Sequence, residues 1–226
     1  MVSNADRGPA PPVVPRKELL LPLVDPDLQG LVRLHYFPFS RIVYRKRLQI
    51  AVDLMSPGAP FDNGLEIGFG PGFLLPSLAR CCRHAVAVDI HEDVGPVSLM
   101  LRRQNVDGVS LMRNSVSDLA FRDAAFDLVV CTSVLEHIHH LDAALREIAR
   151  VVRRHGAVVL GFPVKNRVTD SLFKAVGYEP DEIHPNSHAD IIAAAGQVFR
   201  ITSQQHYPAW LPLDLSLYGW IACEKP

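Results

Sequence analysis

A run of glycines at alternate positions is the feature of this sequence best suited to binding chemistry. Gly68, Gly70 and Gly72 follow Glu66 within the stretch Gly-Leu-Glu-Ile-Gly-Phe-Gly-Pro-Gly, residues 64–72. Glycines at this spacing let the chain turn sharply and let a ligand lie against backbone N–H groups. The third glycine follows the second by two residues, whereas the dinucleotide-binding fingerprint separates them by three. By itself the run also fits an ordinary glycine-proline turn after a strand.

A carboxylate follows the glycines at the distance typical of nucleotide-binding folds. Asp89 lies near the end of the apolar run Ala-Val-Ala-Val-Asp-Ile, residues 85–90, which is expected to form the next strand. In a parallel sheet, ligands bind beyond the carboxyl ends of the strands, where a carboxylate can accept hydrogen bonds from both hydroxyls of a ribose. The simpler interpretation is an aspartate that caps the next turn. Asp89 thus favours a ligand with a nucleoside part, without choosing between nicotinamide and other cofactors.

Histidines are the candidate acid–base residues, because imidazole changes its charge near neutral pH. His137 directly follows Glu136, and His184 and His188 lie in the stretch Ile-His-Pro-Asn-Ser-His, residues 183–188. We expect these three histidines to be the catalytic candidates, acting as a base or as contacts to a second substrate. The alternatives are a structural role for His137 and a capping or solvated role for the other two.

The same histidines bear on metal binding. The spacing of His184 and His188 would place both on one face of a helix, as in some metal sites. Pro185 argues against a regular helix across this pair, and no carboxylate nearby in the sequence provides a third ligand. We therefore expect no metal site. His139 and His140 precede a predicted helix and are expected to be exposed.

The composition excludes several classes of protein. The 226 residues are 48% apolar and 21% charged, which is ordinary for a globular domain. Lysine and arginine number 23 against 24 acidic residues, so we expect no nucleic-acid partner. No apolar run reaches the roughly 20 residues of a transmembrane helix, and no secretory signal is recognisable. Four cysteines without a Cys-x-x-Cys pair favour reduced thiols and a cytoplasmic location.

We expect three segments along the chain. Residues 1–16 contain several prolines and small residues, and predict a flexible tail. Residues 17–60 predict a helical N-terminal lid, with its main helix over residues 40–55. Residues 61–226 predict the main domain.

The helix predicted over residues 40–55 has two distinct faces. Its apolar stripe consists of Tyr44, Leu48, Ala51, Val52 and Met55. Its cations are Arg41, Arg45, Lys46 and Arg47. These cations indicate either a contact of residues 36–47 with a membrane or an anionic substrate, or simply a solvated helix face. Tyr36 or Tyr44 is a further candidate to reach into the ligand pocket.

From residue 62 onward, apolar runs alternate with helical patterns. Predicted strands lie at 64–68, 85–90, 109–112, 126–131, 157–162, 198–206 and 215–223, and predicted helices at 73–82, 94–104, 142–152 and 188–195. Near-continuous apolar strands separated by helices are typical of parallel strands buried on both faces. The fold class is therefore α/β, with a doubly wound sheet.

Five further stretches carry a resemblance to a known family. They are Asn-Ser-Val-Ser-Asp-Leu-Ala-Phe (114–121), Ala-Phe-Asp-Leu-Val-Val-Cys (125–131), Val-Leu-Glu-His-Ile (134–138), Leu-Arg-Glu-Ile-Ala-Arg-Val-Val-Arg-Arg-His-Gly (145–156) and Val-Val-Leu-Gly-Phe-Pro (158–163). Together with the glycine run, they resemble the class I S-adenosylmethionine (SAM)-dependent methyltransferases of the ubiquinone/menaquinone-biosynthesis type. The resemblance covers residues 62–163. It implies a Rossmann-like, seven-stranded sheet with the last strand antiparallel.

The resemblance also implies where SAM would lie. Gly68, Gly70 and Gly72 would follow its methionine part, with Glu66 near its ammonium group. Asp89 would bind the ribose. The other implied cofactor contacts are Ile90 on the adenine face, Ser115 and Val116 at the adenine edge, and Thr132 and Ser133 closing over the methionine end through backbone groups. Ser115 stands where the family has an aspartate, so its contact to the adenine amino group would lack a charge.

The function implied by the resemblance is transfer of a methyl group from SAM to oxygen, nitrogen or carbon of a small-molecule acceptor. Natural products, quinone precursors and lipid-linked sugars are the acceptor classes considered, with residues 164–187 as the acceptor-side loop. A non-catalytic SAM-binding scaffold or sensor is an alternative. An NAD-dependent oxidoreductase is another, but it would need wider glycine spacing and a hydride-site pair that we do not find.

Overall fold

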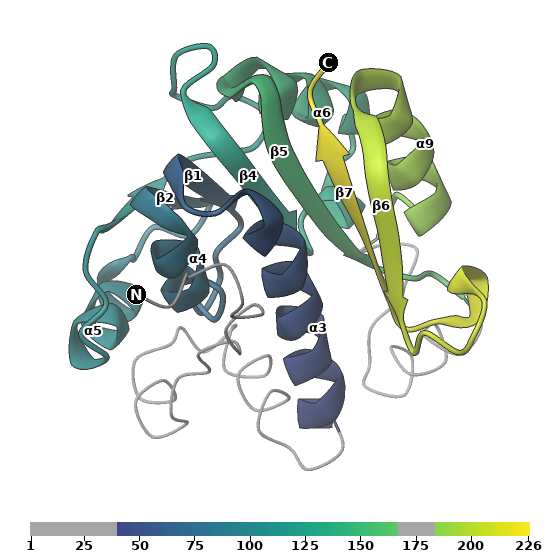
Figure 1. Ribbon diagram of the computed structural model, residues 1–226, viewed down its shortest axis with the longest axis horizontal. Coiled ribbons are helices and arrows are strands. Elements are labelled where there is room, and N and C mark those ends of the chain that lie inside the picture. The colour runs from purple at the N-terminus through teal and green to yellow at the C-terminus, as the bar shows by residue number, and fades with distance from the viewer. Residues whose placement is uncertain (1–39, 167–183) are drawn as a thin grey trace, which may run out of the picture.

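A seven-stranded sheet forms the centre of the protein (Figure 1). The structure is a computed structural model, and it describes residues 40–166 and 184–226. The strands are β1 (Phe61–Ile67), β2 (Cys82–Asp89), β3 (Val109–Arg113), β4 (Phe126–Thr132), β5 (Val152–Pro163), β6 (Arg200–Tyr207) and β7 (Tyr218–Glu224), in the order β3-β2-β1-β4-β5-β7-β6. Strands β1 to β5 are parallel, and β7 is antiparallel to both β5 and β6. The predicted doubly wound sheet with an antiparallel last strand is confirmed.

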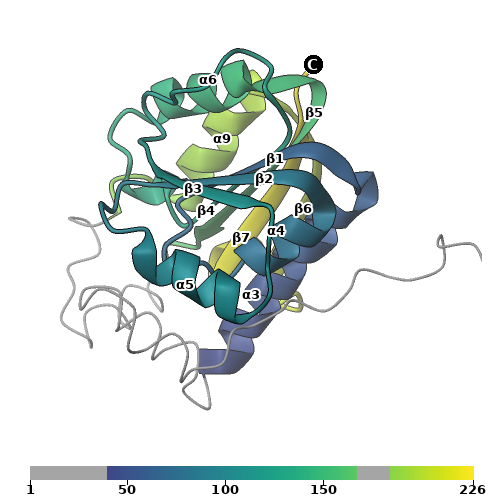
Figure 2. The same cartoon turned by 90° about the vertical axis from the view of Figure 1, so that its left-hand side faces the viewer.

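Helices cover both faces of the sheet, as Figure 2 shows. One face carries α3 (Ser40–Met55), α4 (Leu75–Cys81) and α5 (Gly95–Arg103), and the other carries α6 (Leu141–Val151) and α9 (His188–Val198). The buried side chains form two clusters, one on each side. Strand β4 supplies both clusters alternately, because successive strand residues point to opposite faces: Leu128 and Val130 to the first, Val129 and Cys131 to the second.

The predicted elements are all present, with shifted ends. Helix α3 has the predicted bounds, and its buried residues Leu48, Ala51, Val52 and Met55 match the predicted stripe. Strand β5 begins five residues before the prediction of 157, because α6 leads into it without a loop. The prediction of a helix from residue 73 was wrong by two residues, since Gly72 to Leu74 form a turn before α4.

Some predictions concern segments that the structure does not describe. Residues 1–39 and 167–183 lie outside the described residues, so the tail, the first part of the lid and most of the acceptor-side loop stay predictions. In the described part of α3, Arg41, Arg45 and Lys46 are exposed. None of the helices over residues 40–166 and 184–226 is long and apolar enough to cross a membrane.

Candidate active site

The site lies at the point in the sheet where the strand order changes direction. Strand β1 is flanked by β2 on one side and β4 on the other, both parallel to it. Beyond the carboxyl ends of such neighbouring strands, the connecting loops diverge and leave a crevice. The glycine loop follows β1, Asp89 ends β2, and the segment from Ser133 to His137 follows β4. The fold thus brings most of the predicted site residues to one edge of the sheet.

The three loop glycines have left-handed backbones but different surroundings. Their φ angles are +76° at Gly68, +48° at Gly70 and +80° at Gly72. A Cβ on Gly68 would lie 2.1 Å from the Cγ2 atom of Val134, so the loop passes directly against the segment after β4. A Cβ on Gly70 would meet nothing within 4 Å. Gly70 is therefore the place where a ligand can approach the backbone of the loop closely.

Asp89 connects this loop to the end of β2. Its Oδ2 accepts a hydrogen bond from the Gly70 N–H at 2.7 Å, and its Oδ1 accepts one from the His91 N–H at 3.3 Å. The side chain is only 7% exposed. The turn-capping interpretation of Asp89 is thus correct for one oxygen. A carboxylate has about four lone-pair positions, so both oxygens can accept further bonds from a ligand.

Glu66 is a buried carboxyl group that lacks a donor on one oxygen. It is 2% exposed, and its Oε2 atom has no hydrogen-bond partner among the described residues. Burial, and secondarily the charge of Asp89, raise the pKa of Glu66 well above its usual value. Buried polar atoms are nearly always paired. A cationic hydrogen-bond donor on a ligand would satisfy this oxygen and favour its charged form.

The residues predicted around a nucleoside base lie beyond Asp89. Ile90 is 68% exposed, which is unusual for a large apolar side chain and leaves its surface available to a flat ring. Val116 is buried, so it can offer backbone groups rather than its side chain. The hydroxyl of Ser115 accepts a hydrogen bond from the Ser117 N–H at 3.2 Å. Part of the acceptor capacity predicted for Ser115 is therefore used within its own turn.

Ser133 differs from the sequence-based prediction. Its φ is +56°, and its N–H donates to the carbonyl of Gly161 at 2.8 Å, so the backbone donor expected to close over a ligand is already used. The Ser133 side chain, rather than its backbone, contacts other residues of the site. The hydroxyl accepts a hydrogen bond from Nη2 of Arg47 at 2.6 Å and lies 2.9 Å from the hydroxyl of Tyr218. Thr132, the last residue of β4, is half-buried beside it.

Arg47 and Tyr218 are site residues that the sequence did not single out as a pair. The Arg47 guanidinium carbon lies 4.2 Å from the centroid of the Tyr218 ring, a cation–π contact. Burial raises the pKa of Tyr218, so its hydroxyl stays protonated. One signal could have found Tyr218: an antiparallel last strand places its first residue beside the end of β5, at Pro163. Tyr44, an earlier candidate, lies with its ring centroid 5.8 Å from the Arg47 guanidinium.

His137 and His184 meet, although 47 positions in the chain separate them. Their ring centroids are 4.9 Å apart, and Nε2 of His137 is 4.0 Å from Oε1 of Glu136. Burial, with the neighbouring charges of His137 and Lys165, lowers the pKa of His184 to about 4, so its imidazole is neutral at pH 7. Burial also raises the pKa of Glu136.

These three residues could hold a divalent cation. One ligand atom from each of Glu136, His137 and His184 lies within 4.8 Å of the others, and neutral imidazoles with a carboxylate form a common ligand set. The sequence analysis considered His184 with His188 and expected no metal site. The structure shows instead that His184 has its neighbours in the segment after β4.

Asn186 explains how the loop reaches this position. Its Nδ2 donates to the carbonyls of Leu135 and Ile138, at 2.9 and 2.6 Å, and its N–H donates to the Glu136 carbonyl at 3.3 Å. Ser187 then caps α9 through a reciprocal pair of bonds with Asp190. The loop before α9 is thus tied to η3 (Leu135–His137), and the predicted absence of a helix across Pro185 is confirmed.

His188 has a different partner from the other two catalytic candidates. It begins α9, is 7% exposed, and its Nε2 lies 3.0 Å from Oδ1 of Asp214 in η4 (Leu213–Leu215). Its buried Nδ1 has no partner among the described residues. The structure therefore gives these two catalytic candidates different partners: His184 packs against His137, whereas His188 connects α9 to the segment before β7. His139 and His140 are exposed, as predicted.

Comparison with known proteins identifies the domain. Residues 65–160 match a family model described as a methyltransferase domain. These residues contain the glycine loop, Asp89 and the segment from Ser133 to His137. Residues 65–160 are thus similar to the SAM-dependent methyltransferases, the family that the sequence motifs indicated. The cofactor of this methyltransferase domain is SAM, as the family resemblance implied.

Two relatives match this part of the chain. A probable SAM-dependent methyltransferase of Mycobacterium tuberculosis is 30% identical over 56% of this chain and 44% of its own length. A ubiquinone biosynthesis O-methyltransferase of Hahella chejuensis is 32% identical over 53% of this chain and 50% of its own length. The chain thus spans about half the length of the curated relatives it matches.

Solved structures support the fold of the methyltransferase domain. The N-methyltransferase NodS from Bradyrhizobium japonicum, in complex with S-adenosylhomocysteine, has a TM-score of 0.68 at 18% identity and covers 93% of this chain and 97% of its own. The [4+2]-cyclase SpnF has a TM-score of 0.65 at 14% identity over 80% of this chain and 81% of its own. At such identities the likeness shows the fold alone.

Proposed function

We propose that this protein transfers the methyl group of SAM to oxygen, nitrogen or carbon of a small metabolite. The observation that carries the proposal is the unsatisfied Oε2 of Glu66 beside an open glycine loop that Asp89 holds in place. SAM has the groups that such a site lacks: an ammonium group for Glu66, and ribose hydroxyls for Asp89. When bound, it supplies a methyl group already activated on a sulfonium, so the hard chemistry is the cofactor's.

The remaining cofactor contacts follow the chain. We assign the methionine part to Gly68, Gly70 and Gly72, with Thr132 and the Ser133 side chain on its other side. The adenine is assigned to Ile90, whose exposed surface it would cover, and to Ser115 and Val116 at its edge. The protein's own contribution is to hold the acceptor in line with the methyl group, and such positioning contributes roughly 7–11 kcal/mol in favourable systems.

A hydroxyl or amine acceptor must also lose a proton, and we assign this role to His137. Its side chain is half-exposed and therefore reachable, while the adjacent Glu136 carboxyl can stabilise an imidazolium. His184 packs against the His137 ring, and we assign it to positioning that ring. His188 is assigned to holding α9 through Asp214, rather than to the proton transfer.

The N-terminal segment is assigned to the acceptor side. Residues 17–60 would form a lid, of which α3 is the described part. The support for this role is Arg47, which reaches from α3 to Ser133 at the end of β4. Acceptors among natural products, quinone precursors and lipid-linked sugars all fit this proposal. The four cysteines are free and buried, which supports a cytoplasmic location.

Two measurements test the proposed function. Isothermal titration should show binding of SAM and S-adenosylhomocysteine and none of NAD. Incubation of the protein with methyl-labelled SAM and a metabolite extract should then give a labelled small molecule, and His137→Gln should reduce the labelling without weakening cofactor binding. Binding of NAD alone would contradict the proposal.

A second candidate function is SAM binding without methyl transfer. The specific observation in its favour is that one structural neighbour is described as a [4+2]-cyclase, so this fold also serves other chemistry. Cofactor binding with no labelled product from any extract would favour this alternative.

A further inference from the structure

Arg47 brings a positive charge to the edge of the sheet where the glycine loop lies. It donates to the Ser133 hydroxyl at 2.6 Å and stacks on Tyr218, with its guanidinium carbon 4.2 Å from the ring centroid. Ser133 is followed by Val134, the residue against which Gly68 packs. The guanidinium is therefore connected to the glycine loop through the two adjacent residues Ser133 and Val134.

The guanidinium has more donors than partners. Arginine carries five N–H donors. Over residues 40–166 and 184–226, Arg47 makes one hydrogen bond, to Ser133. The carboxyl group of Glu136 is an electrostatic neighbour of Arg47, but among these residues the two form no ion pair. The Arg47 side chain is half-buried, so water can satisfy only part of it. Carboxylates and phosphates pair with such a fork through two charge-assisted hydrogen bonds.

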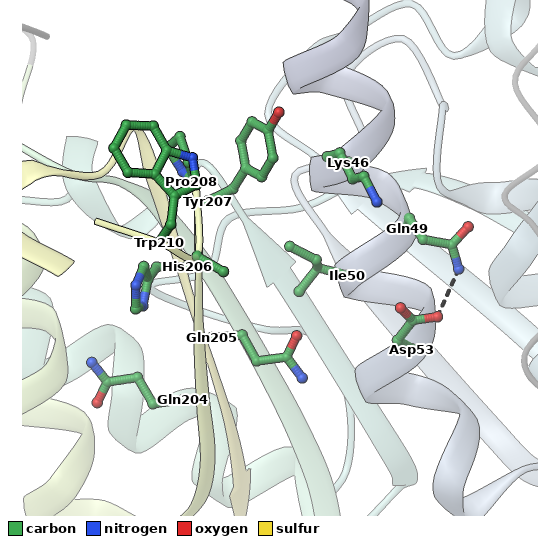
Figure 3. Close-up of a pocket in the computed structure, with 11 residues that line it drawn as sticks. Lys46, Gln49, Ile50, Asp53, Gln204, Gln205, His206, Tyr207, Pro208 and Trp210 are labelled. Carbon is green, nitrogen blue, oxygen red and sulfur yellow. Dashed lines mark hydrogen bonds between the residues drawn. The ribbon is translucent and has the colours of Figure 1, made fainter. Parts of the chain in front are cut away.

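Neighbouring cations of α3 do not share this position. Arg41 and Arg45 are exposed, and Lys46 lines a different cavity, a groove of about 490 Å³ between α3 and β6 (Figure 3). Successive helix residues point about 100° apart, which separates Lys46 from Arg47. Among these four described cations, Arg47 alone contacts the residues at the ends of β4 and β7.

The hydroxyl of Tyr218 lies beside the Arg47 guanidinium. It stays protonated and lies 2.9 Å from the Ser133 oxygen, and either hydroxyl can be the donor of this hydrogen bond. When Ser133 donates, the Tyr218 proton is available to an anion beside the guanidinium.

We propose that Arg47, with the Tyr218 hydroxyl, binds an anionic oxygen group of the methyl acceptor. The acceptor would then belong to the small molecules that carry a carboxylate or a phosphate besides the atom that is methylated. This inference rests on the proposed function, because it places the acceptor next to the cofactor. Arg47 is in this role a residue that determines specificity.

The experiment compares charged and neutral probes on the full chain saturated with S-adenosylhomocysteine. The probes are 4-hydroxybenzoate, 4-hydroxybenzamide and phenyl phosphate, titrated with ligand-observed NMR as the readout. We expect a charged probe to bind at least about tenfold more tightly than the amide. Preference for the benzoate would assign a carboxylate, and preference for phenyl phosphate a phosphate.

Variants test whether Arg47 is the cause of the preference for charged probes. Arg47→Gln should abolish it, Arg47→Lys should retain part of it, and Arg45→Gln, a matched exposed cation on the same helix, should leave it unchanged. Unchanged affinity of each variant for S-adenosylhomocysteine shows that the fold is intact. Equal binding of charged and neutral probes, or a preference that persists in Arg47→Gln, would overturn the role of Arg47 and leave the proposed function standing. Failure of S-adenosylhomocysteine to bind would overturn the proposed function, and this assignment with it.

Discussion

The N–H of Gly70 donates to Oδ2 of Asp89 at 2.7 Å, so one carboxylate fixes the glycine loop to the end of the neighbouring strand. The loop that follows β1 and the last residue of β2 therefore behave as one unit. A change at Asp89 alters the shape of the loop as well as any bond to a ribose.

Asp89→Ala should accordingly weaken cofactor binding more than the loss of a single contact would. We expect the affinity for S-adenosylhomocysteine to fall at least about 100-fold, since both the loop anchor and the ribose acceptor are removed. Stability should fall by only about 1–2 kcal/mol. Isothermal titration and urea unfolding measure the two effects, with Asp118→Ala as an exposed control. Unchanged affinity would show that Asp89 does not face the cofactor.

Glu66→Gln should change the stability and the cofactor affinity of the protein in opposite directions at pH 8. Because burial raises the pKa of Glu66, the folded state favours the protonated form, and the stability that this form provides is lost as pH rises above the unfolded value of about 4.5. The glutamine variant should therefore be more stable than the wild type at pH 8, with the difference vanishing near pH 4. Its affinity for SAM should nevertheless fall, because a neutral amide does not attract an ammonium group. A loss of stability at pH 8 would contradict this account.

Two glycine substitutions should differ in their effects on stability and on cofactor affinity. In Gly68→Ala the new Cβ would lie 2.1 Å from Val134, and the +76° backbone is unfavourable for alanine, so we expect a loss of about 2–3 kcal/mol of stability. In Gly70→Ala no atom lies within 4 Å, and the loss should be about 1 kcal/mol. Cofactor affinity should fall in Gly70→Ala, although this variant loses less stability than Gly68→Ala. Thermal unfolding and titration of both variants make the comparison, and equal stabilities would count against the packing of Gly68 on Val134.

His184 should make stability depend on pH in the weakly acidic range. Its pKa is about 4 in the folded protein and about 6.5 when unfolded, so the unfolded state binds more protons between these values. The contribution is complete above pH 6.5 and is lost progressively as pH falls toward 4, by up to about 3 kcal/mol. Urea unfolding at pH 7.5 and 5 should show a smaller difference for His184→Gln than for the wild type. His139→Gln, an exposed neighbour, should behave like the wild type.

On the donor side of the site, the proximity of the glycine loop and Asp89 could be predicted because both lie at the ends of strands that are close together in the sequence. Gly68 to Gly72 and Asp89 follow consecutive strands, and parallel strands bring their carboxyl ends together whatever the rest of the chain does. The family match over residues 65–160 supports the predicted methyltransferase resemblance, and the sheet confirms the seven strands with an antiparallel last strand. The individual cofactor contacts stay predictions that the experiments above test.

The other side could not be predicted, because it depends on contacts between distant segments. Arg47 meets Tyr218 across 171 positions, and His137 meets His184 only because Asn186 ties its loop to η3. His188 could not be distinguished from His184 by type or spacing; its partner Asp214 lies 26 positions away. Periodicity describes single elements and carries no information about such long-range pairs.

The antiparallel direction of β7 has a consequence for how this protein could change over evolution. Tyr218 comes from the last strand and Arg47 from the helix before the sheet, whereas Glu66 to His137 form one continuous stretch of the chain. If the acceptor binds to Arg47 and Tyr218 as we propose, substitutions in these two flanking segments can alter which molecule is accepted while the stretch in the middle is inherited intact. Chimaeras that exchange only the flanking segments between relatives are, for this architecture, a direct route to new acceptors.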